Sequence, residues 1–67
     1  MNVAATARRV LAEFEEMPGM TLTRHQACRL FGLDEHLARI VLDVLVDLAY
    51  LRESATGKLT LGDRIAA

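Results

Sequence analysis

The side chains with the most reactive chemistry in this sequence are its one cysteine and a nearby histidine. Cys28 follows His25 by three residues, so on a helix the two lie one turn apart, as a thiolate–imidazole pair would. A buried cysteine, however, is usually an inert hydrophobic residue. A chain of 67 residues also has little room for a pocket with converging polar groups. We therefore expect no catalytic residues and no enzymatic activity.

The other polar patterns that could bind a metal, a phosphate or a small molecule are incomplete. His25, Cys28 and His36 lack the paired spacing of zinc ligands, so neither a metal nor another cofactor is expected. The segment SATGK contains a Gly-Lys pair but lacks the spacing of a phosphate-binding loop. Asp43 and Asp47, four residues apart, have the spacing of a solvated helix face. No small-molecule substrate is evident from these residues.

Length and composition predict one small globular domain over residues 1–67. The hydrophobic fraction is 52% and the charged fraction 25%, which is typical of folded chains. The formal net charge is −1, whereas proteins that bind nucleic acid by themselves usually have an excess of Lys and Arg. No secretory signal is evident, and the apolar segment 37–51 is short and interrupted by Asp43 and Asp47. We expect a cytoplasmic protein that makes no membrane contact.

The apolar spacing and the turn residues predict a mainly α chain that ends in a two-stranded β-hairpin. The Pro-Gly pair stops the first helix, and Thr23 with Gln26 forms a capping box for the second. Gly32 is suited to end that helix, and Asp34 is placed to cap the third. Residues 61–67 are expected to form a loose tail or a stub that packs on a neighbour, and Met17 is expected to fill the core. The predicted elements are helices over 3–17, 23–31 and 35 to about 50, and strands over 51–54 and 58–61.

Residues 22–61 resemble a winged helix-turn-helix domain, in which the hairpin is the wing. Cys28 and Gly32 are four residues apart, where that motif usually has a small residue and then the turn glycine. Three further residues match its buried positions: Leu33, Ala38 and Leu42. The chain departs from the pattern at Ala49, where the family often has glycine. The stretch EFEEMPGMTLTRHQACRLFGLD also resembles small uncharacterised bacterial winged-helix proteins.

The resemblance implies a small DNA-binding protein similar to transcription regulators. In that family the start and the outer face of the third helix lie in the major groove. The matching positions here are Asp34, Glu35, His36, Arg39, Ile40 and Asp43. Only Arg39 and His36 have the chemistry to read bases. The phosphate contacts would come from Arg24, Arg29, Arg52 and Lys58. The alternative is that these cations are ordinary solvated surface charges that contact no nucleic acid.

The third predicted helix has more apolar surface than a small core needs. Twelve of the fifteen residues in LARIVLDVLVDLAYL, 37–51, are apolar. Leu37, Ile40 and Val44 have no obvious cover within a winged helix, which predicts a homodimer that buries them. The alternative is that the first helix covers them within one chain. A second candidate function follows, namely a protein-interaction or dimerisation module that has this fold and binds no nucleic acid.

Overall fold

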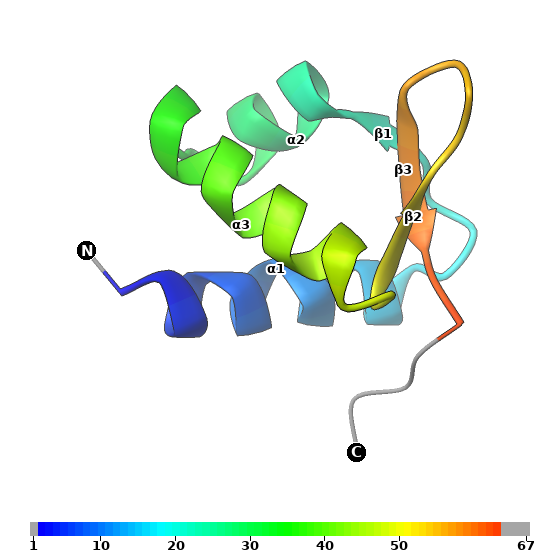
Figure 1. The fold of residues 1–67 in the computed structure, drawn as a ribbon, viewed down its shortest axis with the longest axis horizontal. Coiled ribbons are helices and arrows are strands. Elements are labelled where there is room, and N and C mark those ends of the chain that lie inside the picture. The colour runs from blue at the N-terminus through cyan, green and yellow to red at the C-terminus, as the bar shows by residue number, and fades with distance from the viewer. Residues whose placement is uncertain (1, 64–67) are drawn as a thin grey trace.

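The computed structural model describes residues 2–63, which form three helices and a small three-stranded antiparallel sheet. Helix α1 runs along one edge of the molecule, and α2, α3 and the sheet all lie on the same side of this helix (Figure 1). The predicted arrangement of three helices followed by a hairpin is confirmed. The elements are α1 (Val3–Glu16), β1 (Leu22–Thr23), α2 (Arg24–Leu30), α3 (Glu35–Asp47), β2 (Leu51–Glu53) and β3 (Lys58–Leu61).

Each helix begins at a polar side chain that accepts a backbone hydrogen bond. Asn2 caps α1 by accepting from the amide of Ala5 at 3.0 Å. Thr23 and Gln26 form the predicted capping box of α2, in which each side chain accepts from the other residue's amide. Asp34 caps α3 as predicted. These caps satisfy amides that have no partner within the first turn of a helix.

The second and third helices end in the same hydrogen-bond pattern, although only one of them has glycine at the key position. Gly32 has φ 64° and Ala49 has φ 66°, both in the left-handed region. The amide after each of these residues donates five residues back, from Leu33 to Cys28 at 2.9 Å and from Tyr50 to Leu45 at 3.0 Å. This is the Schellman motif, which usually places glycine at the left-handed position. The helix that precedes β2 therefore ends at a strained alanine.

The sheet has one strand more than the sequence predicted. The order is β1-β3-β2, so β3 lies in the middle and pairs with both neighbours. The hairpin β2–β3 pairs Leu51 with Leu61, as expected for strands on either side of Gly57. The two-residue strand β1 was missed because it is held by the distant pairing of Leu22 with Leu59 and carries no pattern of its own.

The core lies between α1, α3 and the sheet. The rings of Phe14 and Phe31 lie 6.2 Å apart and join α1 to the end of α2. The expectation that Met17 packs in the core is wrong, because α1 ends at Glu16 and the Met17 side chain is 60% exposed. The largest fully buried side chains are Phe14, Leu42, Leu51, Leu59, Val10 and Val41.

The described part of the predicted loose tail is bound to the rest of the chain. Leu61 belongs to β3, and the Gly62 amide donates to the carbonyl oxygen of Tyr50 at 2.8 Å. A side chain at residue 62 would collide with the carbonyl oxygen of Ala49. Asp63 forms an ion pair with Arg52. The prediction of a loose tail is therefore wrong for residues 61–63, and residues 64–67 lie outside the described range.

Candidate nucleic-acid interface and the outer face of the third helix

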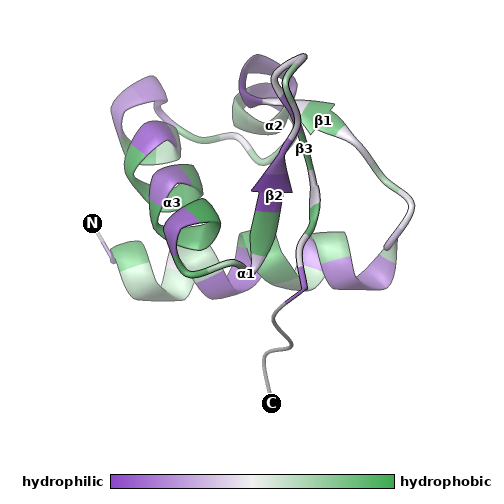
Figure 2. Cartoon of the chain, turned by 45° about the vertical axis from the view of Figure 1, so that its right-hand side comes forward, coloured by the Kyte–Doolittle hydropathy of each residue, from purple (hydrophilic) through white to green (hydrophobic). Residues whose placement is uncertain are grey.

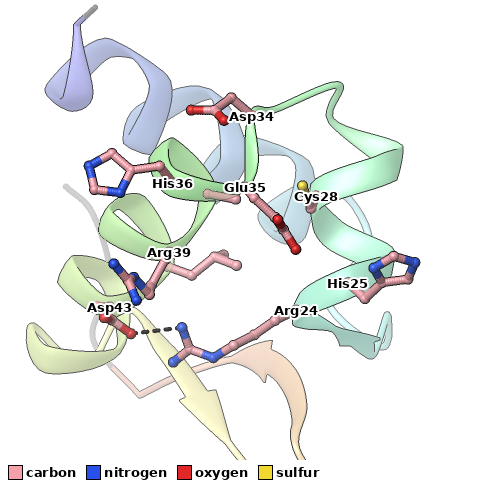
Figure 3. A pocket seen from close by; sticks show the side chains of 10 residues that line it. Arg24, His25, Cys28, Asp34, Glu35, His36, Arg39 and Asp43 are labelled. Carbon is pink, nitrogen blue, oxygen red and sulfur yellow. Dashed lines mark hydrogen bonds and ion pairs between the residues drawn. The ribbon is translucent and has the colours of Figure 1, made fainter.

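The cavity that best fits the predicted site is an open cleft of about 830 Å³ between α2 and α3. Figure 3 shows Arg24 and Glu35 extending into the space between the two helices, whereas His36 extends away from α2. The cleft combines two arginines with three acids, so it is not cationic. Its lining residues are Arg24, His25, Cys28, Asp34, Glu35, His36, Ala38, Arg39, Leu42 and Asp43.

Arg24 is held by two acids from different elements. Its Nε and Nη2 atoms donate to the two carboxylate oxygens of Glu53 at 2.8 and 3.0 Å, which is a bidentate pair. Its Nη1 atom donates to Asp43 at 2.7 Å. One guanidinium at the start of α2 therefore connects the middle of α3 with strand β2.

These contacts change the proton affinities of both partners. The hydrogen bond from Arg24 lowers the pKa of Glu53, with partial burial and the nearby Asp43 charge opposing that effect. The bonds to Glu53, and secondarily to Asp43, raise the pKa of Arg24, although partial burial opposes them. Both groups are therefore charged at neutral pH. The triad of Arg24, Asp43 and Glu53 has a net charge of −1 (one cation and two anions).

The structure divides the predicted DNA-contacting cations into two groups. Arg24 is engaged by Glu53 and Asp43, and Arg52 on the hairpin forms an ion pair with Asp63. The other members of the predicted set are exposed and form no ion pair with a residue in 2–63, namely Arg29, Arg39 and Lys58. The acids that engage Arg24 and Arg52 were missed because they lie far along the chain, beyond any local pattern. Asp43 and Glu53 are 19 and 29 residues from Arg24, and Asp63 is 11 residues from Arg52.

The two predicted base-reading residues lie one helical turn apart on α3, and both line the cleft. Arg39 lies beside Asp43, whereas the His36 ring extends away from α2 (Figure 3). Glu35, in the first turn of α3, also lines this cleft. A phosphate approaching the cleft would therefore meet the carboxylates of Glu35 and Asp43 as well as Arg39.

The residues considered for thiol chemistry are not arranged as a catalytic pair. The Cys28 thiol donates to the carbonyl oxygen of Leu33 at 2.9 Å, and the side chain is half-buried. His25 is exposed and extends away from Cys28 (Figure 3). Among the described residues there is no group of three potential metal ligands. None of the helices in that part of the chain is long and apolar enough to cross a membrane.

The third helix is covered by its own chain more than the sequence suggested, but not completely. Leu37 is half-buried and packs against the core, and Ile40 is half-buried as well. Val44 is 37% exposed and Leu48 45% exposed. Apolar and polar residues alternate along the visible side of α3 (Figure 2). The alternative in which the chain covers these residues itself is thus met in part, at Leu37 and Ile40 more than at Val44.

Comparison of the chain with protein-family models, with curated proteins and with solved structures gave no match.

Proposed function

We propose that the chain is a winged helix-turn-helix domain that binds double-stranded DNA, as small transcription regulators do. The observation that carries the proposal is the element order helix, strand, helix, helix, strand, strand, with sheet order β1-β3-β2. In such a domain, the third helix meets the major groove and the hairpin lies beside it. A fold does not define a function, so the proposal also depends on the charges that this surface presents.

Three cations of the predicted interface remain available for DNA: Arg29, Arg39 and Lys58. Arg39 is the candidate for base contact, because a guanidinium can donate two hydrogen bonds to guanine. The two phosphate contacts that remain, from Arg29 and Lys58, give a slope of about −2 in a plot of log affinity against log salt, compared with about −4 if Arg24 and Arg52 also took part. We therefore propose weak binding that is only moderately sensitive to salt.

The proposal is tested by fluorescence anisotropy with a random-sequence duplex at low and moderate salt. We expect binding in the range of tens of micromolar that Arg39→Ala weakens by roughly tenfold. The control is Arg8→Ala, which removes an equally charged and exposed side chain from α1. Equal losses of affinity in Arg39→Ala and Arg8→Ala would show that only the net charge matters, which would contradict a specific role for Arg39.

A second candidate function is a protein-interaction module with the same fold. It is favoured by the ion pairs that engage Arg24 and Arg52, and by the exposed Val44 on α3. Absence of any anisotropy change at roughly 100 µM protein in low salt would support this candidate over DNA binding. The homodimer expected from the sequence stays a prediction under either candidate.

A further inference from the structure

The outer face of α3 has an apolar row that is only partly covered within residues 2–63. The row, defined here as Leu37, Ile40 and Val44, follows the edge of the buried face of the helix, and Val44 is 37% exposed although its neighbour Val41 is 0% exposed. Residues 40 and 44 are one turn apart and form a continuous surface. Burial of such side chains removes apolar surface from water, so the row is a source of binding energy.

Two polar side chains, a hydrogen-bond donor and a carboxylate acceptor, lie beside the two ends of this row. His36 lies beside its N-terminal end and Asp47 beside its C-terminal end, and both are exposed. They are eleven residues apart, about 16 Å along the helix axis, so they cannot contact each other within one chain. Neither side chain forms an ion pair with another residue of the described range.

We propose that a second copy of the chain binds this row, with the two α3 helices antiparallel about a two-fold axis. In a two-fold contact, residue i meets residue j and residue j meets residue i. An axis that passes near residue 42 brings Ile40 of one copy onto Val44 of the other. The same register brings His36 beside Asp47 at both ends, where either form of the imidazole can donate a hydrogen bond to the carboxylate.

The positions of His36 and Asp47 favour an antiparallel second copy as the occupant of the row. In a parallel pair, His36 of one copy and Asp47 of the other would stay about 16 Å apart along the helix axes, so the two side chains could not meet. Asp43, which also borders the row, is already paired with Arg24 at 2.7 Å, so its charge opposes the contact less. The row is short, so we expect a small interface and a dissociation constant in the micromolar range.

The proposal goes beyond DNA binding and is tested without DNA, by sedimentation equilibrium of the full chain up to roughly 500 µM. We expect a monomer–dimer equilibrium that Val44→Asp weakens by at least about tenfold. The matched control is Leu30→Asp, which places the same charge at a 61% exposed leucine on α2. A monomer at all concentrations, or equal weakening by both variants, overturns the proposal.

A charge exchange tests the register itself. His36→Asp brings two acids together across the contact, and Asp47→Lys removes the acceptor of His36, so each single variant weakens association. The double variant His36→Asp/Asp47→Lys restores it, because the new carboxylate at position 36 of one copy would face the new ammonium group at position 47 of the other. Failure of the double variant to restore association overturns the antiparallel register.

The same exchange is expected to leave the fold of each copy intact. The new acid lies in the first turn of α3 and the new base in the last, where each favours the helix dipole. We therefore expect weakened association in the single variants without unfolding. Circular dichroism of each variant checks that its helical content is unchanged.

Discussion

The guanidinium of Arg24 faces the carboxylate of Glu53 in a bidentate pair, with donor–acceptor distances of 2.8 and 3.0 Å. The pair joins the first residue of α2 to the last residue of β2, which are 29 residues apart in the sequence. Its side chains are 35% and 28% exposed, so solvent screens them only in part. The pair therefore fixes the hairpin relative to the helices more firmly than an isolated surface ion pair would.

A double-mutant cycle of Arg24→Met and Glu53→Gln measures this coupling. We expect an interaction energy of about 0.5–1 kcal/mol in the free energy of unfolding, because the geometry is bidentate but the site is partly solvated. Urea denaturation followed by circular dichroism gives the four values. The control cycle, Arg52→Met with Asp63→Asn, concerns a pair with 59% and 87% exposed side chains and is expected to give almost no coupling. Equal interaction energies in the two cycles would contradict the claim that partial burial makes the Arg24–Glu53 pair the stronger one.

The lowered pKa of Glu53 predicts how stability depends on pH. Because the folded-state pKa lies below the ordinary value of 4.5, the ionised carboxylate stabilises the fold above that value. This contribution is lost as the pH falls through the lowered pKa. The wild type should therefore lose more stability than Glu53→Gln when urea denaturation is repeated at acidic pH. In the Arg24→Met background the difference should disappear, since Arg24 is the main cause of the shift.

The left-handed alanine at the end of α3 predicts a stabilising substitution. Ala49→Gly removes the strain of φ 66° and is expected to stabilise the fold by about 0.5–1 kcal/mol, after the larger chain entropy of glycine in the unfolded state is subtracted. This corresponds to an increase of about 4 °C in Tm. The reciprocal variant Gly32→Ala, at φ 64° in the same motif, should lower stability by about 1 kcal/mol. Thermal unfolding of both variants tests the pair, and changes of the same sign would contradict it.

The pairing of Arg24 with Asp43 predicts that removing an acid strengthens DNA binding. Asp43→Asn leaves Arg24 held by Glu53 and removes a negative charge from the side of α3 that borders the cleft. We expect higher affinity for duplex DNA and a salt slope steeper by about one unit. Glu13→Gln removes the same charge from α1 and serves as the control. If both variants bind with the same slope, the change in net charge accounts for the gain, and the Nη1 group of Arg24 freed from Asp43 does not.

The fold could be predicted wherever the cause was local in sequence. Thr23 with Gln26, Asp34 and Gly32 each act within five residues, and each of these predictions is confirmed. Strand β1 could not be predicted, because two residues carry no periodicity and Leu22 is held by Leu59, far along the chain. Local chemistry thus determines where the helices begin and where α2 ends, and distant pairing determines the sheet. The end of α3 was not predicted, since the helix ends at Asp47 and not near residue 50.

The candidate site was less predictable than the fold. The sequence identified which cations the hairpin and the second helix contain, but not that Glu53 and Asp43 engage one of them. Similarly, the count of apolar residues in α3 indicated excess surface but not that Leu37 would pack against the core. Charge pairing and side-chain cover depend on the crossing of elements, which periodicity does not encode.

The double engagement of Arg24 also affects how this surface can evolve. Because Glu53 holds the guanidinium through two bonds, replacement of Asp43 leaves the hairpin anchored while the local charge changes by one unit. Loss of this acid can thus make the surface less negative without a new arginine and without any change in the scaffold that orients the existing one.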